Sequence, residues 1–376
     1  MPPEFHGVTT LKAIFGGMLA YRDLVPVDRR LPGGPELRAG LGAAGQWMPR
    51  KTDPACGPIV AELLRRARKL TPAAPPLRRL VYLGDSRPSD GAAFTAICAA
   101  GGWPGRLFIG QDDLSEPPRL EWLEPRCLAN RWALLGEFID QLEATRFLLD
   151  AQTAVVIDVD KTILGARGRN DFAIDGAREE ALVRTAAAVV GGRYDEERFL
   201  AAYRVLRQPM FHPFTGDNHD LLAYLCLVIS TGLIQLDKLL SHLEQHRVES
   251  FDQLLRSLSA RGRQLADAGL AAVHADFQHA FLAGDPTPFK LFRQNEFLAT
   301  AARLSFPAGI GAAALVRDHL VITEEVATAA KRLQTAGVLV FGLSDKPVEA
   351  SWPPPGTTGR PLHELPAGVV GIPATG

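Results

Sequence analysis

The chain has 376 residues, of which 47% are hydrophobic and 22% are charged, and its formal net charge is -1. This balance is typical of a globular protein and excludes wholesale disorder, and the near-zero charge provides no basic surface for binding nucleic acid. The four cysteines are far apart in the sequence. This spacing argues against a zinc site or a disulfide scaffold and favours a cytoplasmic protein.

No stretch of the sequence is typical of a membrane or export segment. No apolar run approaches the ~20 residues that a membrane span requires. The apolar stretch over residues 11–19 is interrupted by Lys12 and two glycines and lacks a basic leader, so we do not expect a signal peptide. We therefore expect neither a membrane nor a nucleic acid as a partner, and the sequence leaves the oligomeric state open.

Up to residue 150 the sequence alternates helical and strand patterns. The first fifty residues are irregular, with Pro and Gly clusters near residues 32–35. Apolar periodicity and β-branched runs then predict a helix, a strand, a helix, a strand and a long helix, in that order. These elements cover residues 58–69, 80–83, 92–100, 107–109 and 129–149. The middle three form a β-loop-α-β unit.

The segment from Ala154 to Leu164 joins a buried strand to two acids. Residues 154–157 are apolar and rich in β-branched side chains, as in a buried strand. Asp158 and Asp160 follow where that strand ends. Because ligands of open α/β sheets bind outside the carboxyl ends of the strands, the pair predicts a site for a cation, a phosphate or both. Turn chemistry, which also favours Asp, is the plainer interpretation.

Over residues 165–317 the pattern is helical throughout. The α/β pattern then returns, with a helix over residues 323–333 and an apolar strand over residues 338–343 that ends at Ser344. A short apolar piece follows at residues 369–370. The chain thus inserts a helical block between two strands that each end in polar residues.

This arrangement resembles a known enzyme family. The run Asp158-Val159-Asp160-Lys161-Thr162-Ile163-Leu164 is similar to the first motif of the haloacid dehalogenase-like (HAD) hydrolases, in the phosphatase form with two aspartates. Residues 338–344 resemble their second motif, and the helical block lies where they carry an α-helical cap. The resemblance implies an α/β fold, with a three-layer Rossmann-like parallel sheet and a large inserted all-α cap. The core would comprise residues 1–164 and 318–376, and the cap residues 165–317.

The order of the motifs departs from the family, which also needs a lysine and a further acidic motif downstream of the second motif. Beyond Asp345 the chain has no aspartate, and its only lysine there is Lys346. Upstream, residues 80–90 resemble the fourth motif through Asp85 and Asp90. Lys51 precedes the helix that leads into that strand, as the third-motif lysine does.

We therefore infer a circularly permuted HAD core, in which motifs three and four precede motif one, the cap and motif two. Chain termini in compact domains lie at the surface and are often close, so the break can move without changing the packed sheet. Lys346 stays an alternative to Lys51 as the lysine that binds phosphate. Two other interpretations stay open: Asp90 as a simple helix cap, and residues up to about 125 as a separate α/β domain.

The resemblance implies a role for each acid. Asp158 would attack phosphorus and become an aspartyl phosphate. Asp160 would protonate the leaving alkoxide and then deprotonate the attacking water. Mg²⁺ would be held by Asp158, the backbone carbonyl of Asp160 and Asp85. Asp90 would be a direct or an indirect ligand of the same ion.

Ser344 and Lys51 would hold the transferring phosphoryl oxygens. On the substrate side we name Thr162 and Lys161 of the first motif and Arg293 of the helical block. Lys161 stands where the family usually has a small residue, so it reaches either toward substrate or toward solvent. Arg293 could pair with an anionic group remote from the phosphate, although a solvated helix face is the plainer interpretation.

The function that follows is a Mg²⁺-dependent phosphatase that hydrolyses a small-molecule phosphate monoester through an aspartyl-phosphate intermediate. Two alternatives remain. One is a phosphotransferase or mutase of the same superfamily that uses the same intermediate. The other is a degenerate HAD module that binds a ligand or a partner without turnover.

Overall fold

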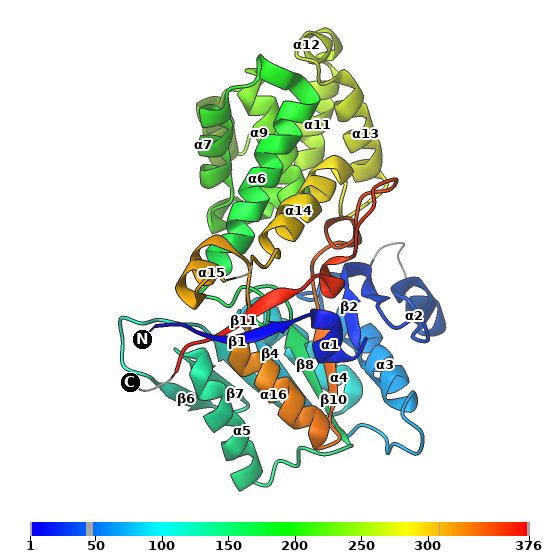
Figure 1. The fold of residues 1–376 in the computed structure, drawn as a ribbon. Coiled ribbons are helices and arrows are strands. Elements are labelled where there is room, and N and C mark those ends of the chain that lie inside the picture. Colours follow the sequence, from blue (N-terminus) through cyan, green and yellow to red (C-terminus); the bar gives the residue numbers. More distant parts are fainter. Residues whose placement is uncertain (1, 43–47, 308, 374–376) are drawn as a thin grey trace. The chain divides into compact units, whose positions relative to one another are not determined.

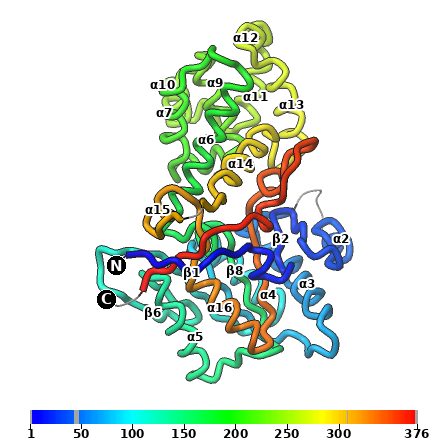
Figure 2. The backbone as a smooth tube through the Cα atoms, viewed as in Figure 1, coloured from blue at the N-terminus to red at the C-terminus, as the bar shows by residue number. Residues whose placement is uncertain are grey.

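The computed structural model describes residues 2–42, 48–307 and 309–373. The chain is mixed α/β and divides into two compact units. Unit 1 comprises Met1–Gly176 and Thr300–Gly376, and unit 2 comprises Ala177–Ala299. The chain passes from unit 1 to unit 2 through helix α6 (Asp171–Val190) and returns through α14 (Lys290–Arg303), as Figure 1 and Figure 2 show. The sequence had placed these boundaries at residues 164/165 and 317/318.

Unit 1 is built on an eight-stranded sheet formed by the described residues. Its strand order is β3-β2-β10-β8-β4-β5-β7-β6. In that order the strands are Val25–Pro26, Leu19–Tyr21, Leu339–Leu343, Thr153–Asp158, Arg79–Gly84, Gly105–Gly110, Arg126–Ala129 and Leu120–Leu123. The six inner strands run parallel, and β3 and β6 pair antiparallel at the two ends of the sheet. The carboxyl ends of the inner strands therefore meet at one edge.

The central strands β10, β8 and β4 are buried along almost their whole length. Parallel strands covered on both faces read as continuous apolar runs, which is why the sequence revealed them. On one face, Ala154, Val156 and Phe341 pack with residues of α3 (Cys56–Lys69) and α4 (Ser89–Gly101). Helices α5 (Leu135–Ala144) and α16 (Glu324–Thr335) pack on the opposite face (Figure 1).

The register of the strands brings three loops together. Leu343 of β10 pairs with Asp158 of β8, and Leu83 of β4 pairs with Ile157 of β8. Ser344 and the loop after Gly84 therefore start at the level where β8 ends. The alternative of a separate domain in the first 125 residues is wrong, because β4 is hydrogen-bonded to β8 within the same sheet.

A smaller sheet of unit 1 joins segments from both ends of the described chain. Its strand order is β1-β11-β9, with β1 at Glu4–Thr9, β11 at Ala367–Gly371 and β9 at Ile322–Thr323. Strand β1 pairs antiparallel with β11, so the chain that precedes β2 lies beside the chain that follows β10. The helices α1 (Leu11–Phe15), α2 (Gly34–Gly40) and α15 (Ala312–Asp318) complete this unit.

Unit 2 is helical in its described residues. Between the ends of α6 and α14 that it contains lie α7 to α13. These are Glu196–Leu206, His212–Thr215, His219–Ser230, Leu236–Glu244, Phe251–Ser259, Gly262–Asp267 and Ala271–Leu282. Helix α9 is buried from Asp220 to Ser230 and forms the centre of the apolar core of this unit, as expected for a helix that is apolar on all sides.

Two predictions about local structure are wrong. The first fifty residues were expected to be irregular, but the described ones contain β1, α1, β2, β3 and α2. The predicted helix over residues 129–149 is shorter: residues 126–129 form β7, and the helix spans Leu135–Ala144. Buried Cys127 alternates with exposed Arg126 on a strand that pairs with β5 and β6, and the apolar pattern alone did not reveal that pairing. Within the described residues, no helix is long and apolar enough to cross a membrane.

Candidate functional site

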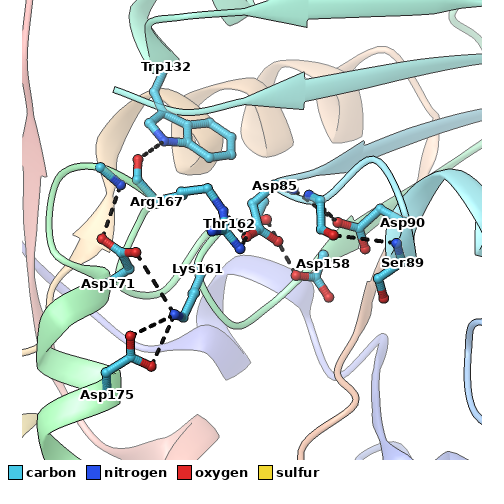
Figure 3. A network of polar contacts seen from close by, with 12 residues as sticks. Asp85, Ser89, Asp90, Trp132, Asp158, Lys161, Thr162, Arg167, Asp171 and Asp175 are labelled. Carbon is cyan, nitrogen blue, oxygen red and sulfur yellow. Dashed lines mark hydrogen bonds and ion pairs between the residues drawn. The ribbon is translucent and has the colours of Figure 1, made fainter. Parts of the chain in front are cut away.

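Three aspartates of unit 1 converge at the carboxyl edge of the main sheet. Asp158 ends β8, Asp85 follows β4, and Asp90 lies in the first turn of α4 (Figure 3). One carboxylate oxygen from each lies within 4.8 Å of those of the other two. Their side chains are 4%, 7% and 0% exposed, in the order given. We call this group the acidic cluster, and its carboxylates can hold a metal ion.

Asp90 organises the cluster through its hydrogen bonds. Its Oδ2 accepts from the backbone N–H groups of Asp85 (3.0 Å) and Ser86 (2.9 Å), and its Oδ1 accepts from Tyr82 Oη (3.2 Å) and Lys51 Nζ (2.9 Å). A carboxylate has about four acceptor positions, so these four bonds nearly exhaust it. Asp90 therefore fixes the loop that presents Asp85, and it is not the N-cap of α4, which is Pro88.

Gly84 permits this arrangement of the loop. A Cβ atom at that position would lie 2.4 Å from Oδ2 of Asp90. A side chain would therefore push Asp90 away from the backbone N–H groups that it binds. The glycine before Asp85 at the end of β4 is therefore required for steric reasons.

Lys51 bridges two of the acids. Its Nζ donates to Asp158 Oδ1 (2.6 Å) and to Asp90 Oδ1 (2.9 Å). Burial acts to lower the pKa of Lys51, but the charges of Asp158 and Asp90 reverse that effect, so its pKa lies well above the ordinary value. Lys51 is therefore a buried cation at neutral pH. The competing Lys346 is also buried, and its backbone N–H donates to Ser344 Oγ (3.1 Å).

The acidic cluster carries more negative charge than its neighbours neutralise. Arg167 binds Asp85, with Nε donating to Oδ2 at 2.5 Å, so in the ion pairs of the described residues two cations, Lys51 and Arg167, face three carboxylates. Burial raises the pKa of Asp158 well above its ordinary value. The charge of Lys51 lowers this pKa, but the charges of Asp90 and Asp85 raise it further. Burial and Asp90 likewise raise the pKa of Asp85 to about 6. A further cation would relieve this repulsion.

The donor set fits a hard divalent cation. Carboxylate oxygens are the ligands that Mg²⁺ and Ca²⁺ prefer. Asp158 Oδ2 accepts, among the described residues, one long hydrogen bond, from Thr162 Oγ1 at 3.4 Å, so that oxygen retains acceptor capacity. Asp85 and Asp158 are thus the residues best able to bind an ion directly, and Asp90 supports them.

The loop after β8 places Asp160 and Lys161 apart from the three clustered carboxylates. The side chain of Asp160 does not belong to the acidic cluster, and its charge, after burial, helps to raise the pKa of Tyr21. Lys161 has a positive φ of 64° and directs Nζ to both carboxylate oxygens of Asp175 at 3.0 Å (Figure 3). The structure shows neither of the two predicted orientations, toward substrate or toward solvent. Lys161 instead binds acids in the first turns of α6.

Ser344 lies at the same sheet edge. It is 2% exposed, its N–H donates to Ala20 O at 2.9 Å, and it lines a small pocket together with Lys51 and Tyr21. Because Leu343 pairs with Asp158, Ser344 and Lys51 flank the end of β8.

Two residues of the site had not been identified from the sequence. Tyr82 lies within a predicted strand, where an aromatic residue is ordinary, and burial raises the pKa of its phenol well above the usual value. Arg167 lies in the loop before α6, with no motif around it. Its backbone carbonyl accepts from Asp112 N (2.9 Å) and Trp132 Nε1 (3.2 Å), which fixes the point from which its side chain reaches Asp85.

Arg293, a predicted substrate-binding residue, belongs to unit 2. Its guanidinium donates to Asp220 Oδ2 through Nε (2.8 Å) and Nη2 (2.5 Å), and to Glu296 Oε2 through Nη1 (2.7 Å). Arg178 binds the other oxygen of Glu296 at 3.3 Å. These four residues form what we call the balanced cluster, because two arginines face two acids.

Comparison with known proteins identifies no relative. No protein-family model, curated protein or solved structure matches this chain. The functional argument therefore depends on the residues and their geometry.

Proposed function

We propose that the protein is a Mg²⁺-dependent phosphatase of the HAD type, which hydrolyses a small-molecule phosphate monoester through an aspartyl phosphate on Asp158. The observation that carries this proposal is the convergence of Asp85 and Asp158 within 4.8 Å. Asp158 is at the same time hydrogen-bonded to Lys51. These residues are far apart in the sequence, and each was named from a different motif.

The strand order supports a permuted HAD core. Strands β2, β10, β8, β4 and β5 are adjacent and parallel, and helices pack on both faces of their sheet. The helical unit 2 lies between β8 and β10 in the chain, as a cap between motifs one and two does. Strand β1 pairs with β11, so the segments that the permutation would rejoin are neighbours, which makes the rearrangement physically simple.

The ion that this core requires is Mg²⁺, which takes oxygen ligands in octahedral geometry and retains several waters. Asp158, Asp85 and the backbone carbonyl of Asp160 would hold it, and Asp90 would keep Asp85 in position. When bound, the ion supplies positive charge between the carboxylates and the phosphate, which otherwise repel each other.

The residues of the chain then divide the reaction into two displacements. A carboxylate oxygen of Asp158 attacks phosphorus, the bond from phosphorus to the ester oxygen breaks, and Asp160 gives its proton to the departing alkoxide. In the second step Asp160 takes a proton from water, whose oxygen attacks phosphorus and releases inorganic phosphate and Asp158. Lys51 and Ser344 stabilise the charge on the transferring oxygens.

The test is hydrolysis of p-nitrophenyl phosphate with and without Mg²⁺, by the wild type and Asp158→Asn. We expect Mg²⁺-dependent release of nitrophenol by the wild type and none by the variant. The control is Asp140→Asn, which changes an exposed aspartate on α5 and should retain full activity. Transfer of phosphate to an added alcohol but never to water would favour a phosphotransferase. Metal binding with neither hydrolysis nor phosphorylated Asp158, examined by mass spectrometry, would favour a binding module.

A further inference from the structure

A cavity of about 420 Å³ in unit 1 shares Asp85 with the acidic cluster. The loop after β4, the residues at the end of β5, the β6–β7 hairpin and Arg167 form its wall. Its volume lies within the range of pockets that bind small molecules. A molecule in this cavity would therefore lie beside one of the proposed metal ligands.

The wall of the cavity carries more cationic than anionic groups. Arg87, Arg119 and Arg167 line it, together with two acids, Asp85 and Glu121. Arg119 and Glu121 approach to 3.9 Å in an exposed pair, and such pairs contribute little energy. Arg87 makes no hydrogen bond or ion pair with any residue that the structure describes. Guanidinium groups bind carboxylates and phosphates through two parallel hydrogen bonds.

Two of the arginines have a fixed backbone. Asn130 Oδ1 accepts from the N–H of Arg119 at 2.7 Å, and Asn130 Nδ2 donates to Pro117 O at 2.8 Å, which ties the hairpin together. Arg167 is held by the bonds that its carbonyl accepts from Asp112 and from Trp132, the second of which Figure 3 shows. The cavity thus presents cations from defined positions.

The remaining wall limits the size and kind of occupant. Its apolar part comes from Pro88, Ile109 and Leu128, which can contact a short carbon chain. None of the described residues that line the cavity is aromatic, so a nucleobase would find no ring on which to stack. These features favour a small, strongly anionic molecule.

We propose that this cavity binds a second anionic group of the substrate, so that the substrate class is a short phosphate monoester whose other end carries a carboxylate or a phosphate. The inference rests on the proposed phosphatase function, because it places the reacting phosphate at Asp158 and the second anion at Arg87 and Arg119. Both anions offer the oxygens that guanidinium groups recognise.

The first experiment compares three-carbon monoesters that differ only at the far end. Glycerol 3-phosphate has a neutral end, 3-phosphoglycerate a carboxylate, and glycerol 1,3-bisphosphate a second phosphate. We expect kcat/KM of the wild type with Mg²⁺ to be at least about tenfold higher for one or both of the charged esters, as one charge-assisted contact allows. The ester that gains more identifies the preferred anion.

The second experiment removes the cations of the cavity. In Arg87→Gln/Arg119→Gln the preference for the charged ester over glycerol 3-phosphate should fall by about tenfold or more, through KM. Arg126→Gln is the matched control, because Arg126 is an exposed arginine at the other end of β7 and does not line the cavity. The control should retain the wild-type preference.

Equilibrium binding separates the two proposals. Calorimetry of 3-phosphoglycerate and of the bisphosphate on Asp158→Asn protein with Mg²⁺ should show weaker binding when the two arginines are also replaced. If p-nitrophenyl phosphate is hydrolysed but neither charged ester is preferred, or the double variant keeps the preference, the cavity proposal is wrong and the phosphatase proposal stands. If no ester is hydrolysed, the phosphatase proposal fails, and unchanged binding in the double variant then overturns the cavity proposal as well.

Discussion

Two of the buried clusters of charged side chains in the described residues, one in each unit, differ in charge balance. The balanced cluster of unit 2 pairs Arg293 and Arg178 with Asp220 and Glu296. The acidic cluster of unit 1 sets three carboxylates against Lys51 and Arg167. Of these two clusters, the acidic cluster sets more carboxylates than cations against each other, whereas the balanced cluster does not.

This difference shows that burial of charge does not by itself identify a functional site. In unit 2 burial raises the pKa of Asp220 too, but the charges of Asp220 and Glu296 hold the pKa of Arg293 above its ordinary value, and the two arginines match the two acids in number. In unit 1 the pKa of Asp158 and of Asp85 is raised by burial and by neighbouring carboxylates. An added cation should therefore stabilise the acidic cluster. It should not stabilise the balanced cluster, where the charges already match.

The largest expected change in stability comes from the balanced cluster. Asp220→Ala removes the carboxylate that binds Arg293 twice, and a buried ion pair that loses one partner destabilises a protein by about 3–5 kcal/mol. Asp252→Ala, in an exposed i,i+4 pair with Arg256 of the same unit, should cost only about 0.3–0.5 kcal/mol. Urea unfolding of both variants measures the difference. Equal losses would show that the Arg293 network is not the buried, charge-matched unit described here.

A second prediction concerns the strand end opposite Asp85. Ser344 is buried beside the end of β8 and lines a pocket with Lys51. If its hydroxyl donates to the transferring phosphoryl group, Ser344→Ala should lower kcat by about 10²- to 10³-fold. Ser351→Ala is a suitable control, because this buried serine bonds Pro347 O and lies outside the pocket. A loss in KM alone would instead show that Ser344 contributes equally to ground-state and transition-state binding.

The strands that end at the acidic cluster and at Ser344 could be predicted because their sequence signal is local. Strands β4, β8 and β10 are apolar runs that end in polar residues, and parallel pairing brings those ends to one edge. Strand β2 has three residues and depends on β10 for its pairing, so no local pattern marks it. Arg167 becomes part of the site only because Asp112 and Trp132 hold its backbone.

Arg293 illustrates the opposite case. A cationic side chain on a cap helix is a reasonable substrate ligand, but its partner Asp220 is 73 residues away in the sequence. Partnerships between distant residues decide whether a charge is available, and a single sequence does not display them.

Binding of Mg²⁺ should also distinguish the two clusters. Binding at the acidic cluster should raise the free energy of unfolding of the wild type by about 2.7 kcal/mol when Mg²⁺ is at about 100 times its Kd. Asp158→Asn should show a much smaller gain. Asp220→Ala, although less stable, should gain as much as the wild type, since its lost carboxylate belongs to the other cluster. Equal gains in all three proteins would place the ion elsewhere.

The smallest expected effect is a pH dependence of the metal-free protein. The pKa of Asp85 is raised from 3.8 to about 6, so the folded chain binds this proton more tightly than the unfolded chain. The stability that the proton contributes is complete below pH 3.8 and is lost as the pH rises through about 6. Relative to Asp85→Asn, which lacks this titration, the wild type should therefore become less stable between these pH values. With Mg²⁺ present the trend should reverse, because the ion binds only after the proton leaves. Urea unfolding at pH 4, 5, 6 and 7, with and without Mg²⁺, measures both trends. A wild type that gains stability with pH in the absence of metal would mean that Arg167 outweighs burial at Asp85, and the acidic cluster would then lack the excess charge that favours an ion.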